Sequence, residues 1–344
     1  MFSKSDSYRR EARLYETEDD GRVRCFLCAH HCRIHEHKFG ICNVRQNIDG
    51  KLYTLVYGRA IAEHTDPIEK KPLYHFYPGS TSYSIATPGC NFHCGWCQNW
   101  QIAHLPRYQP LPTGRQLPPE QVVATAQRQG CKSIAYTYTE PTIFFEYALD
   151  TANLAHEAGI ANVFVTNGFM TNEMLDAFPT LDAANVDLKS FRDSTYKRQT
   201  KARLQPVLDS MKSMKQRGIW LEVTTLLIPN VNDSSEELRD IATFIAGELG
   251  PETPWHISRY FPNYKVTDQP ITPVETLHEA MEIGQAAGLQ YIYMGNVRGE
   301  NGRDTRCPNC DHTLIQRQGY VIRSQQIQNG RCPNCDTVIA GVGL

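Results

Sequence analysis

Three cysteines have a spacing that suits an incompletely ligated iron–sulfur cluster. Cys90, Cys94 and Cys97 form a C-x3-C-x2-C pattern with no fourth cysteine nearby. Three thiolates can hold three irons of a [4Fe–4S] cube and leave the fourth iron open, whereas electron-transfer clusters use four cysteines. An open iron can bind a small molecule, as the open position of a catalytic zinc does. The alternatives are a zinc knuckle, which normally needs two closely spaced pairs, and buried free thiols.

The pattern resembles the signature of the radical S-adenosylmethionine (SAM) enzymes. The resemblance implies that SAM chelates the open iron through its amino and carboxylate groups. It also implies that the reduced cluster splits SAM into methionine and a 5′-deoxyadenosyl radical. The cysteines follow a short β-like run that Pro88-Gly89 interrupts, so we expect them on the loop that leaves a strand. Phe92, Trp96 and Trp100 are expected to shield the cluster from water.

The elements that position this loop repeat along the middle of the chain. Buried strands are expected at seven apolar runs: Tyr83–Thr87, Ser133–Thr137, Asn162–Thr166, Ala184–Leu188, Trp220–Leu227, Trp255–Arg259 and Tyr291–Met294. Alternating strands and helices imply a parallel sheet with helices packed outside. The predicted fold is therefore α/β, a closed or partial βα barrel of about six units. The carboxyl ends of its strands meet on one face, where such barrels carry chemistry.

Amphipathic helices are expected between the strands. Leu204, Val207, Leu208, Met211 and Met214 share one helix face, and that helix should stop near Gly218. Capping boxes predict two further helices, one opened by Ser234 with Glu237 and one opened by Thr272 with Glu275.

Polar residues follow nearly every predicted strand. Taken alone, each is an ordinary loop residue or helix cap, as expected for Asn232, Asp233 and Ser234. Together, six such sites on one face favour a functional site. They comprise the cysteines, Thr139-Glu140, Asn167-Gly168, Asp187 with Lys189, the turn after Leu227, and His256 with Arg259.

Residues from about 80 to 300 resemble the organic-radical-activating branch of the radical SAM enzymes, which includes the pyruvate formate-lyase activating enzymes. The resemblance implies that Glu140 meets the amino group of SAM, although Tyr138-Thr139 replaces the two glycines of that motif. It implies that Lys189 pairs with the SAM carboxylate and that Asp187 helps to hold SAM or a cation. It also assigns Asn167 to a Thr-Asn-Gly motif and His256 to a SAM contact. A hydrogen-bonded core histidine is the alternative for His256.

A closer resemblance covers almost the whole chain. The runs Asp66–Phe76, Thr137–Pro141, Val223–Leu226 and Pro254–Ile257 are similar to the AmmeMemoRadiSam-system radical SAM enzyme, a family named for two companion proteins. That resemblance leaves the substrate open, because a shared barrel does not determine it. A glycyl-radical enzyme, a small molecule or another peptide remain candidates, with flavodoxin or ferredoxin as the one-electron donor. The Asp66–Phe76 run lies either near the mouth of the site or on a solvated turn with Glu69, Lys70 and Lys71.

The tail carries two Cys-Pro-Asn-Cys knuckles. Cys307, Cys310, Cys332 and Cys335 predict a structural tetrahedral zinc, with a rubredoxin-type iron site as the alternative. The intervening run reads as a hairpin. We therefore divide the chain into residues 1–80, a Cys-rich accessory region; 81–300, the barrel; and 305–344, a zinc-ribbon-like tail.

A third cysteine group lies near the N-terminus. Cys25, Cys28, Cys32 and Cys42 suffice for zinc or for an auxiliary iron–sulfur cluster, and nearby histidines could substitute as ligands. The group lacks a preceding strand and the later acidic and basic partners, so we assign it an accessory metal and not the SAM cluster. Cys131 is expected to be a buried thiol.

Composition narrows the possible partners. The chain has 344 residues with a formal net charge of −2, which argues against a large nucleic-acid surface. No apolar run approaches the ~18 residues of a membrane helix. Clustered cysteines without an apolar leader favour metal binding in the reducing cytoplasm. A non-catalytic zinc-ribbon binding protein with a degenerate barrel is the alternative from another class.

Overall fold

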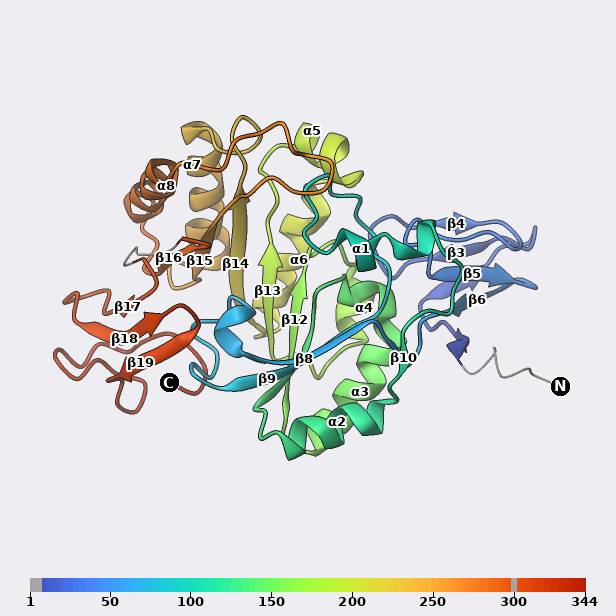
Figure 1. The fold of residues 1–344 in the computed structure, drawn as a ribbon, viewed down its shortest axis with the longest axis horizontal. Helices are drawn as coiled ribbons and strands as arrows, with labels where there is room; N and C mark the ends of the chain where they lie inside the picture. Colours follow the sequence, from blue (N-terminus) through green and yellow to red (C-terminus); the bar gives the residue numbers. More distant parts are fainter. Residues whose placement is uncertain (1–7, 298–301) are drawn as a thin grey trace. The chain divides into compact units, whose positions relative to one another are not determined.

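The computed structural model describes residues 8–297 and 302–344 (Figure 1). The chain forms two compact units, each assembled from separated segments. The first comprises residues 1–66, 81–182 and 200–202, and the second comprises residues 67–80, 183–199 and 203–344. The two units are described separately below.

The first unit begins with small antiparallel sheets. Strands β1, β6 and β5 form one sheet, β2, β3 and β4 form another, and β7 pairs with β10. Their bounds are β1 Arg10–Glu11, β2 Tyr15–Thr17, β3 Val23–Cys25, β4 Arg33–Ile34, β5 Arg45–Ile48, β6 Lys51–Thr54, β7 Arg59–Ala60 and β10 Arg115–Gln116.

Parallel strands form the centre of the first unit. Here β12 (Ala161–Thr166), β11 (Ser133–Tyr136), β9 (Thr81–Ala86) and β8 (Ala62–Pro67) follow one another in that order. In register, Ile85 lies opposite Tyr136, which lies opposite Phe164. The three strands β9, β11 and β12 run parallel, so their carboxyl ends lie at one edge.

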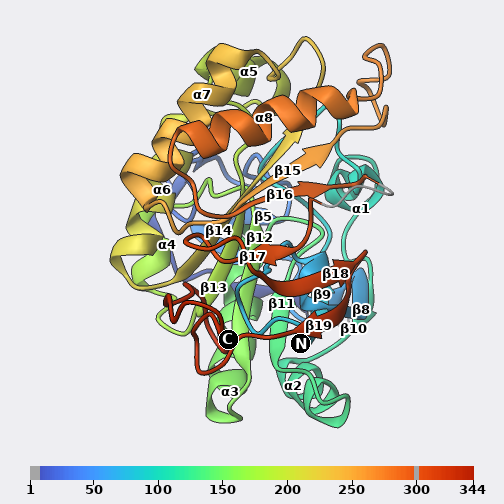
Figure 2. The ribbon, with the colours of Figure 1, turned by 90° about the vertical axis from the view of Figure 1, so that its left-hand side faces the viewer.

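Helices follow these strands in the first unit. Figures 1 and 2 both show α2 beside α3. The bounds are α1 Trp100–Ala103, η3 Leu105–Arg107, α2 Pro119–Arg128, η4 Pro141–Phe144, α3 Phe145–Glu157 and α4 Asn172–Asp176.

The second unit repeats the pattern with four parallel strands in the order β16, β15, β14 and β13. One register row crosses all four strands, from Asp187 through Thr224 and His256 to Tyr293. The bounds of the strands are β13 Ala183–Asp187, β14 Trp220–Leu227, β15 Trp255–Arg259 and β16 Ile292–Gly295. All seven predicted strands are confirmed, each within two residues at its start and one at its end.

Helices of the second unit pack on these strands, with α7 beside α8 in Figures 1 and 2. Their bounds are η2 Ile68–Lys70, α5 Asp193–Thr195, the π-helix η5 Tyr196–Thr200, α6 Gln205–Gln216, α7 Ser235–Phe244, the π-helix η6 Ile245–Leu249 and α8 Val274–Ala286.

The predicted capping boxes have different outcomes. The Ser234 side chain accepts a hydrogen bond from the backbone N–H of Glu237 at 3.3 Å, which confirms the N-cap of α7. The reciprocal half of the box is replaced, because Glu237 Oε1 accepts from the Ser190 hydroxyl and the Phe191 N–H. The second prediction is wrong, because Pro273 is the N-cap of α8. Thr272 instead donates to the Leu227 carbonyl at 2.6 Å and accepts from the Tyr260 N–H at 3.1 Å. Its hydroxyl therefore ties a loop to the end of β14.

The tail of the second unit is a small three-stranded sheet, the ribbon. It contains β17 (Thr305–Arg306), β18 (Thr313–Gln318) and β19 (Val321–Gln325), in red in Figures 1 and 2. The predicted hairpin is thus confirmed.

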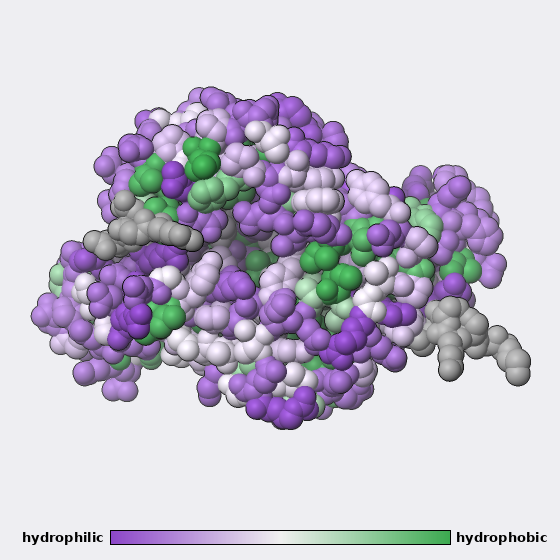
Figure 3. Space-filling model, in the orientation of Figure 1, coloured by the Kyte–Doolittle hydropathy of each residue, from purple (hydrophilic) through white to green (hydrophobic). Residues whose placement is uncertain are grey.

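Hydrophilic residues cover most of the face shown in Figure 3, with hydrophobic residues gathered in a few small groups. Within residues 8–297 and 302–344, the structure has no helix that is long and apolar enough to cross a membrane. The interior of each unit contains large, fully buried side chains, such as Tyr136 in the first unit and Trp255 in the second.

Candidate functional site

The three cysteines lie on the loop that leaves β9, as predicted. The backbone N–H of Phe92 donates to the Cys90 sulfur at 3.3 Å, and the Asn167 amide nitrogen lies 4.0 Å from the same sulfur. Burial raises the pKa of the Cys90 thiol, and the negative charges of Glu140, Cys94 and Cys97 raise it further. Binding a metal would therefore release protons from these thiols.

These residues fit an open iron–sulfur cluster. Phe92 and Trp96, which lie on the same loop as the thiols, are buried, while Trp100 is half-buried. A single zinc with bonds of ~2.3 Å would draw its thiolate sulfurs to about 3.8 Å from one another. Cys90, Cys94 and Cys97 do not gather so closely: their sulfurs do not all lie within 4.8 Å of one another. The wider arrangement suits thiolates that each bind a different iron of a cube.

In the first unit, Glu140 is the second part of the candidate site, after the three cysteines. It is 2% exposed and caps η4 from the end of β11. Its Oε1 accepts hydrogen bonds from the Thr142 N–H at 3.1 Å and from the Thr142 and Thr166 hydroxyls at 2.6 Å. Its Oε2 accepts from the Asn167 N–H at 2.8 Å. Burial raises the pKa of Glu140, while these four bonds favour the charged form.

Asn167 joins the carboxylate to the cysteine loop. Its backbone N–H donates to Glu140 Oε2, and its side-chain nitrogen donates to the side-chain oxygen Oδ1 of Asn91 at 2.8 Å. Asn91 is fully buried and immediately follows Cys90. The structure thus brings Cys90, Glu140 and Asn167 together at the carboxyl ends of β9, β11 and β12.

Tyr138 replaces a glycine of the resembling motif and retains a glycine-like backbone. Its φ is +63°, in the left-handed region that a side chain rarely adopts. The Tyr138 hydroxyl donates to Asp66 Oδ2 at 2.5 Å, and the Ser84 hydroxyl donates to the same oxygen at 3.2 Å. The side chain is therefore anchored away from the backbone that precedes Glu140.

In the second unit, Asp187 and Lys189 form an ion pair. Asp187 ends β13, and its Oδ2 lies 2.8 Å from the Lys189 Nζ. The lysine side chain is 16% exposed and the aspartate side chain 33%. Asn232 donates to the Lys189 carbonyl at 2.8 Å and accepts from the Ile228 N–H at 2.7 Å. It is thus the turn residue that was expected, and it also supports the backbone of Lys189.

His256 lies on β15 among buried polar side chains. Its Nε2 is 2.6 Å from Glu222 Oε2, and Glu222 also accepts from the N–H groups of Tyr74 at 2.9 Å and His75 at 2.8 Å. Burial alone would raise the pKa of Glu222, but the hydrogen bond and charge of His256 and the charge of His75 lower it. His256 therefore has the partner of a core histidine, and a contact with SAM stays a prediction.

The Asp66–Phe76 run contributes to this network. Glu69 and Lys71 are 1% and 2% exposed, so the alternative of a solvated turn is wrong for these two residues, whereas Lys70 is exposed. The buried Arg317 of β18 lies over the Tyr74 ring at 4.3 Å and donates to the Tyr74 carbonyl at 2.9 Å. Arg317 thereby holds this run against the ribbon, which explains why the run is buried.

Sequence reasoning missed the residues that support the predicted ones. Thr142 and Asn91 are common polar types with no pattern of their own, whereas Thr166 belongs to the Thr-Asn-Gly motif but had no expected role of its own. Glu222 carried a usable signal, because a carboxylate inside the apolar run Trp220–Leu227 requires buried partners.

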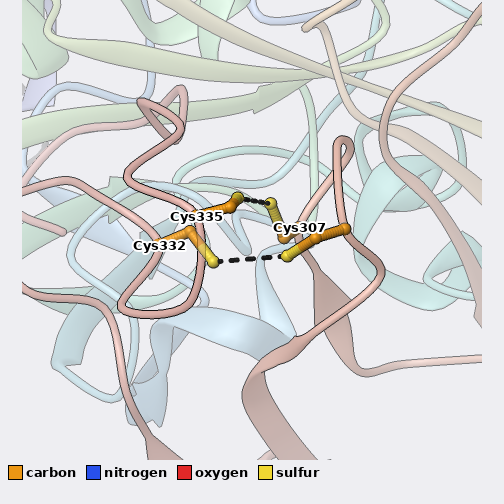
Figure 4. Close-up of side chains that lie close together, drawn as sticks. Cys307, Cys332 and Cys335 are labelled. Atoms are coloured by element: carbon orange, nitrogen blue, oxygen red, sulfur yellow. Dashed lines mark hydrogen bonds between the residues drawn. The ribbon is translucent and has the colours of Figure 1, made fainter.

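The four tail cysteines form a compact tetrad. The Cys307 and Cys335 sulfurs lie 3.5 Å apart and the Cys310 and Cys332 sulfurs 3.7 Å apart. Figure 4 shows Cys332 and Cys335 facing Cys307 across one small space. All four sulfurs lie within 4.8 Å of one another, the separation that a shared tetrahedral ion requires. This cluster could bind a metal.

Comparisons with known proteins identify similar sequences and a similar fold. Residues 84–245 match the Radical SAM superfamily. An uncharacterized protein of Methanocaldococcus jannaschii is 48% identical over 90% of this chain and 91% of its own length. The pyruvate formate-lyase-activating enzyme of Clostridium pasteurianum is 22% identical over 46% of this chain and 66% of its own. Streptococcus suis SuiB, solved bound to S-adenosylmethionine, is 13% identical over 67% of this chain and 53% of its own, with a TM-score of 0.49.

The chain belongs to the radical SAM superfamily, with distant homology to glycyl-radical activating enzymes. Its fold is the radical SAM α/β fold, with central parallel strands and a C-terminal cysteine-rich cluster. The family implies a [4Fe–4S] cluster and SAM as cofactors.

Proposed function

We propose that this chain is an enzyme that cleaves SAM reductively and abstracts hydrogen from a substrate. The observation that carries the proposal is the group formed by Cys90, Asn167 and Glu140, with three cysteines and no fourth on the β9 loop. When bound, the cluster and SAM supply a 5′-deoxyadenosyl radical, and that chemistry belongs to the cofactor.

The protein's own residues bind and orient. Cys90, Cys94 and Cys97 hold the cluster, and Phe92 and Trp96 keep water away from it. The Oε2 of Glu140 accepts one hydrogen bond within the protein and retains a lone pair for the SAM amino group, which a charge-assisted bond would hold. From the resemblance we assign Lys189 to the SAM carboxylate, Asp187 to SAM or a cation, and His256 to a further contact.

We further propose a structural zinc at Cys307, Cys310, Cys332 and Cys335. The sulfur separations of 3.5 Å and 3.7 Å support a single tetrahedral ion. Because the chain uses cysteine for metals, we propose that the enzyme works in the reducing cytoplasm, with a flavodoxin or ferredoxin as its electron donor.

The test is anaerobic reconstitution with iron and sulfide. The wild-type protein should become brown and, with dithionite and SAM, release 5′-deoxyadenosine. Cys94→Ala should abolish that product, whereas Cys131→Ala, at a buried thiol outside all three cysteine groups, should retain it. A colourless, zinc-only wild-type protein would instead identify a non-catalytic zinc-ribbon binding protein.

For the substrate we propose a glycyl-radical enzyme, because distant relatives carry that activity in their names. The test mixes the reconstituted enzyme with a glycyl-radical enzyme candidate and looks for a glycyl signal by electron paramagnetic resonance. Activity on a small molecule or another peptide, together with the AmmeMemo companion proteins, is the second candidate. The near-complete resemblance to that family supports it. Product formation that needs the companions and gives no glycyl signal would favour it.

A further inference from the structure

We propose that Cys25, Cys28, Cys32 and Cys42 bind a second, fully ligated iron–sulfur cluster of [4Fe–4S] size. This site lies entirely within the first unit. It goes beyond the proposed function and does not depend on it, because four thiolates close every iron and leave no position for SAM.

The four thiols line a single cavity. They come from the end of β3 and the loops around β4, and none of them forms a disulfide. Backbone N–H groups, including those of Leu27, His30, Ile41 and Val44, favour the charged form of these four thiols. Apolar side chains complete the wall: Leu27, Ile34, Ile41 and Ile143. A water-poor cavity with backbone donors at each sulfur is suited to thiolates that share negative charge.

Arg45 indicates that the occupant is an anion. Its side chain lines the cavity and is 1% exposed. One guanidinium nitrogen, Nη2, binds Glu146 at 2.5 Å, whereas Nε and Nη1 have no hydrogen-bond partner. A buried donor without an acceptor costs about 1–3 kcal/mol, and more when charged. A group that brings negative charge and acceptor atoms into the cavity would satisfy these donors, as thiolates and inorganic sulfides do.

The sulfurs of this group are less closely gathered than those of the tail tetrad. Among residues 8–297 and 302–344, the tail tetrad is the one group of three or more potential ligands whose ligand atoms all lie within 4.8 Å of one another. No three of the sulfurs of Cys25, Cys28, Cys32 and Cys42 meet that limit. In this they match the Cys90 group and differ from the tail. A cube, whose corners bind one thiolate each, suits the wider spacing.

The site adjoins the loop of the proposed SAM cluster. His30 Nε2 donates to the Asn91 carbonyl at 2.9 Å, so this ring nitrogen binds the loop and is not available as a ligand. A Cβ added at Gly89 would lie 2.6 Å from a Val44 methyl and 3.3 Å from the Cys42 carbonyl. Glycine therefore permits the two cysteine segments to pack directly together.

The experiment uses the full-length protein, reconstituted anaerobically. A variant with Cys90→Ala, Cys94→Ala and Cys97→Ala lacks the thiols of the proposed SAM cluster. Its remaining cysteine groups are the N-terminal group and the tail tetrad. We expect it to retain about four irons and four acid-labile sulfides, with Mössbauer spectra of a cube. Its reduced electron paramagnetic resonance signal should not change when SAM is added. Adding Cys28→Ala and Cys32→Ala to this variant should remove the iron, while Cys131→Ala on the same background should retain it.

The outcomes are distinct. A triple variant that contains no iron and about two zincs per chain would overturn the proposal and assign zinc to both tetrads. Loss of all metal from the N-terminal group would overturn it as well. The result does not require the Cys28→Ala and Cys32→Ala protein to fold, because the triple variant leaves the second site intact. Failure of the proposed function would be seen separately, as a wild-type protein whose iron signal is indifferent to SAM.

Discussion

Replacing Glu140 with glutamine tests the binding role of this carboxylate while retaining its shape. An amide nitrogen cannot accept a hydrogen bond. If the nitrogen took the Oε1 position, the three hydrogen bonds from Thr142 and Thr166 would lose their acceptor. If it took the Oε2 position, only the Asn167 N–H would lose its acceptor. The side chain of Glu140→Gln should therefore place its nitrogen at Oε2, where the SAM amino group is proposed to bind.

Two effects follow, and each has its own magnitude. One buried backbone N–H without an acceptor lowers the free energy of unfolding by about 1–3 kcal/mol. The SAM ammonium loses a hydrogen bond to a charged group, which is worth about 1.5–3 kcal/mol. The second loss corresponds to a dissociation constant for SAM that is higher by about 10- to 150-fold.

The assay is anaerobic equilibrium dialysis of SAM against the reconstituted variant, with iron content measured on the same sample. Urea denaturation gives the loss of stability. Glu157→Gln is the matched control, since it neutralises an exposed glutamate at the end of α3 and should change neither quantity. The reasoning is refuted if Glu140→Gln retains its iron and binds SAM as tightly as the wild type.

Three further predictions follow from individual residues. Burial lowers the pKa of His75 from 6.5 to about 4. As pH falls from 6.5 to 4, the unfolded chain gains a proton at this histidine that the folded chain does not. The free energy of unfolding should therefore fall by about 3 kcal/mol over this range. Urea denaturation of His75→Gln should show a smaller decrease over the same pH range. The lowered pKa of Glu222 acts in the same direction, since its contribution is present above pH 4.5 and is lost below it. Position 138 has a left-handed backbone, where alanine has a steric penalty that glycine lacks. The free energy of unfolding, measured in urea, should therefore be about 1 kcal/mol higher for Tyr138→Gly than for Tyr138→Ala; equal stabilities would contradict this. Cys310→Ser should lower the zinc content by about one per chain and expose the ribbon to protease, whereas unchanged zinc would place the metal elsewhere.

Much of the fold follows from local patterns. The alternation of apolar runs and amphipathic segments predicted all seven parallel strands, because burial on both faces of a parallel strand requires an apolar run. The error at Thr272 is instructive. The Thr-x-x-Glu pattern is typical of a capping box, yet its hydroxyl binds the distant Leu227 carbonyl, and a tertiary contact prevails over a local one.

Some residues of the proposed site could likewise be predicted from the sequence, and others could not. The spacing of Cys90, Cys94 and Cys97 and the position of Glu140 after a strand are visible in the sequence. The four hydrogen bonds that Glu140 accepts within the protein are not visible in the sequence, because two of the donors lie 26 and 27 residues away.

The sequence by itself predicted which residues are suited to bind metals and after which strands the polar groups lie, since metal chemistry depends on residue type and spacing. Only the tertiary structure decided what each charge faces. Arg45 meets Glu146, 101 residues away, and points two unpaired donors into a cavity of thiols. Glu222 meets His256 from another strand. Such partners depend on how strands and loops pack, because a buried charge takes whichever counter-charge the fold brings to it.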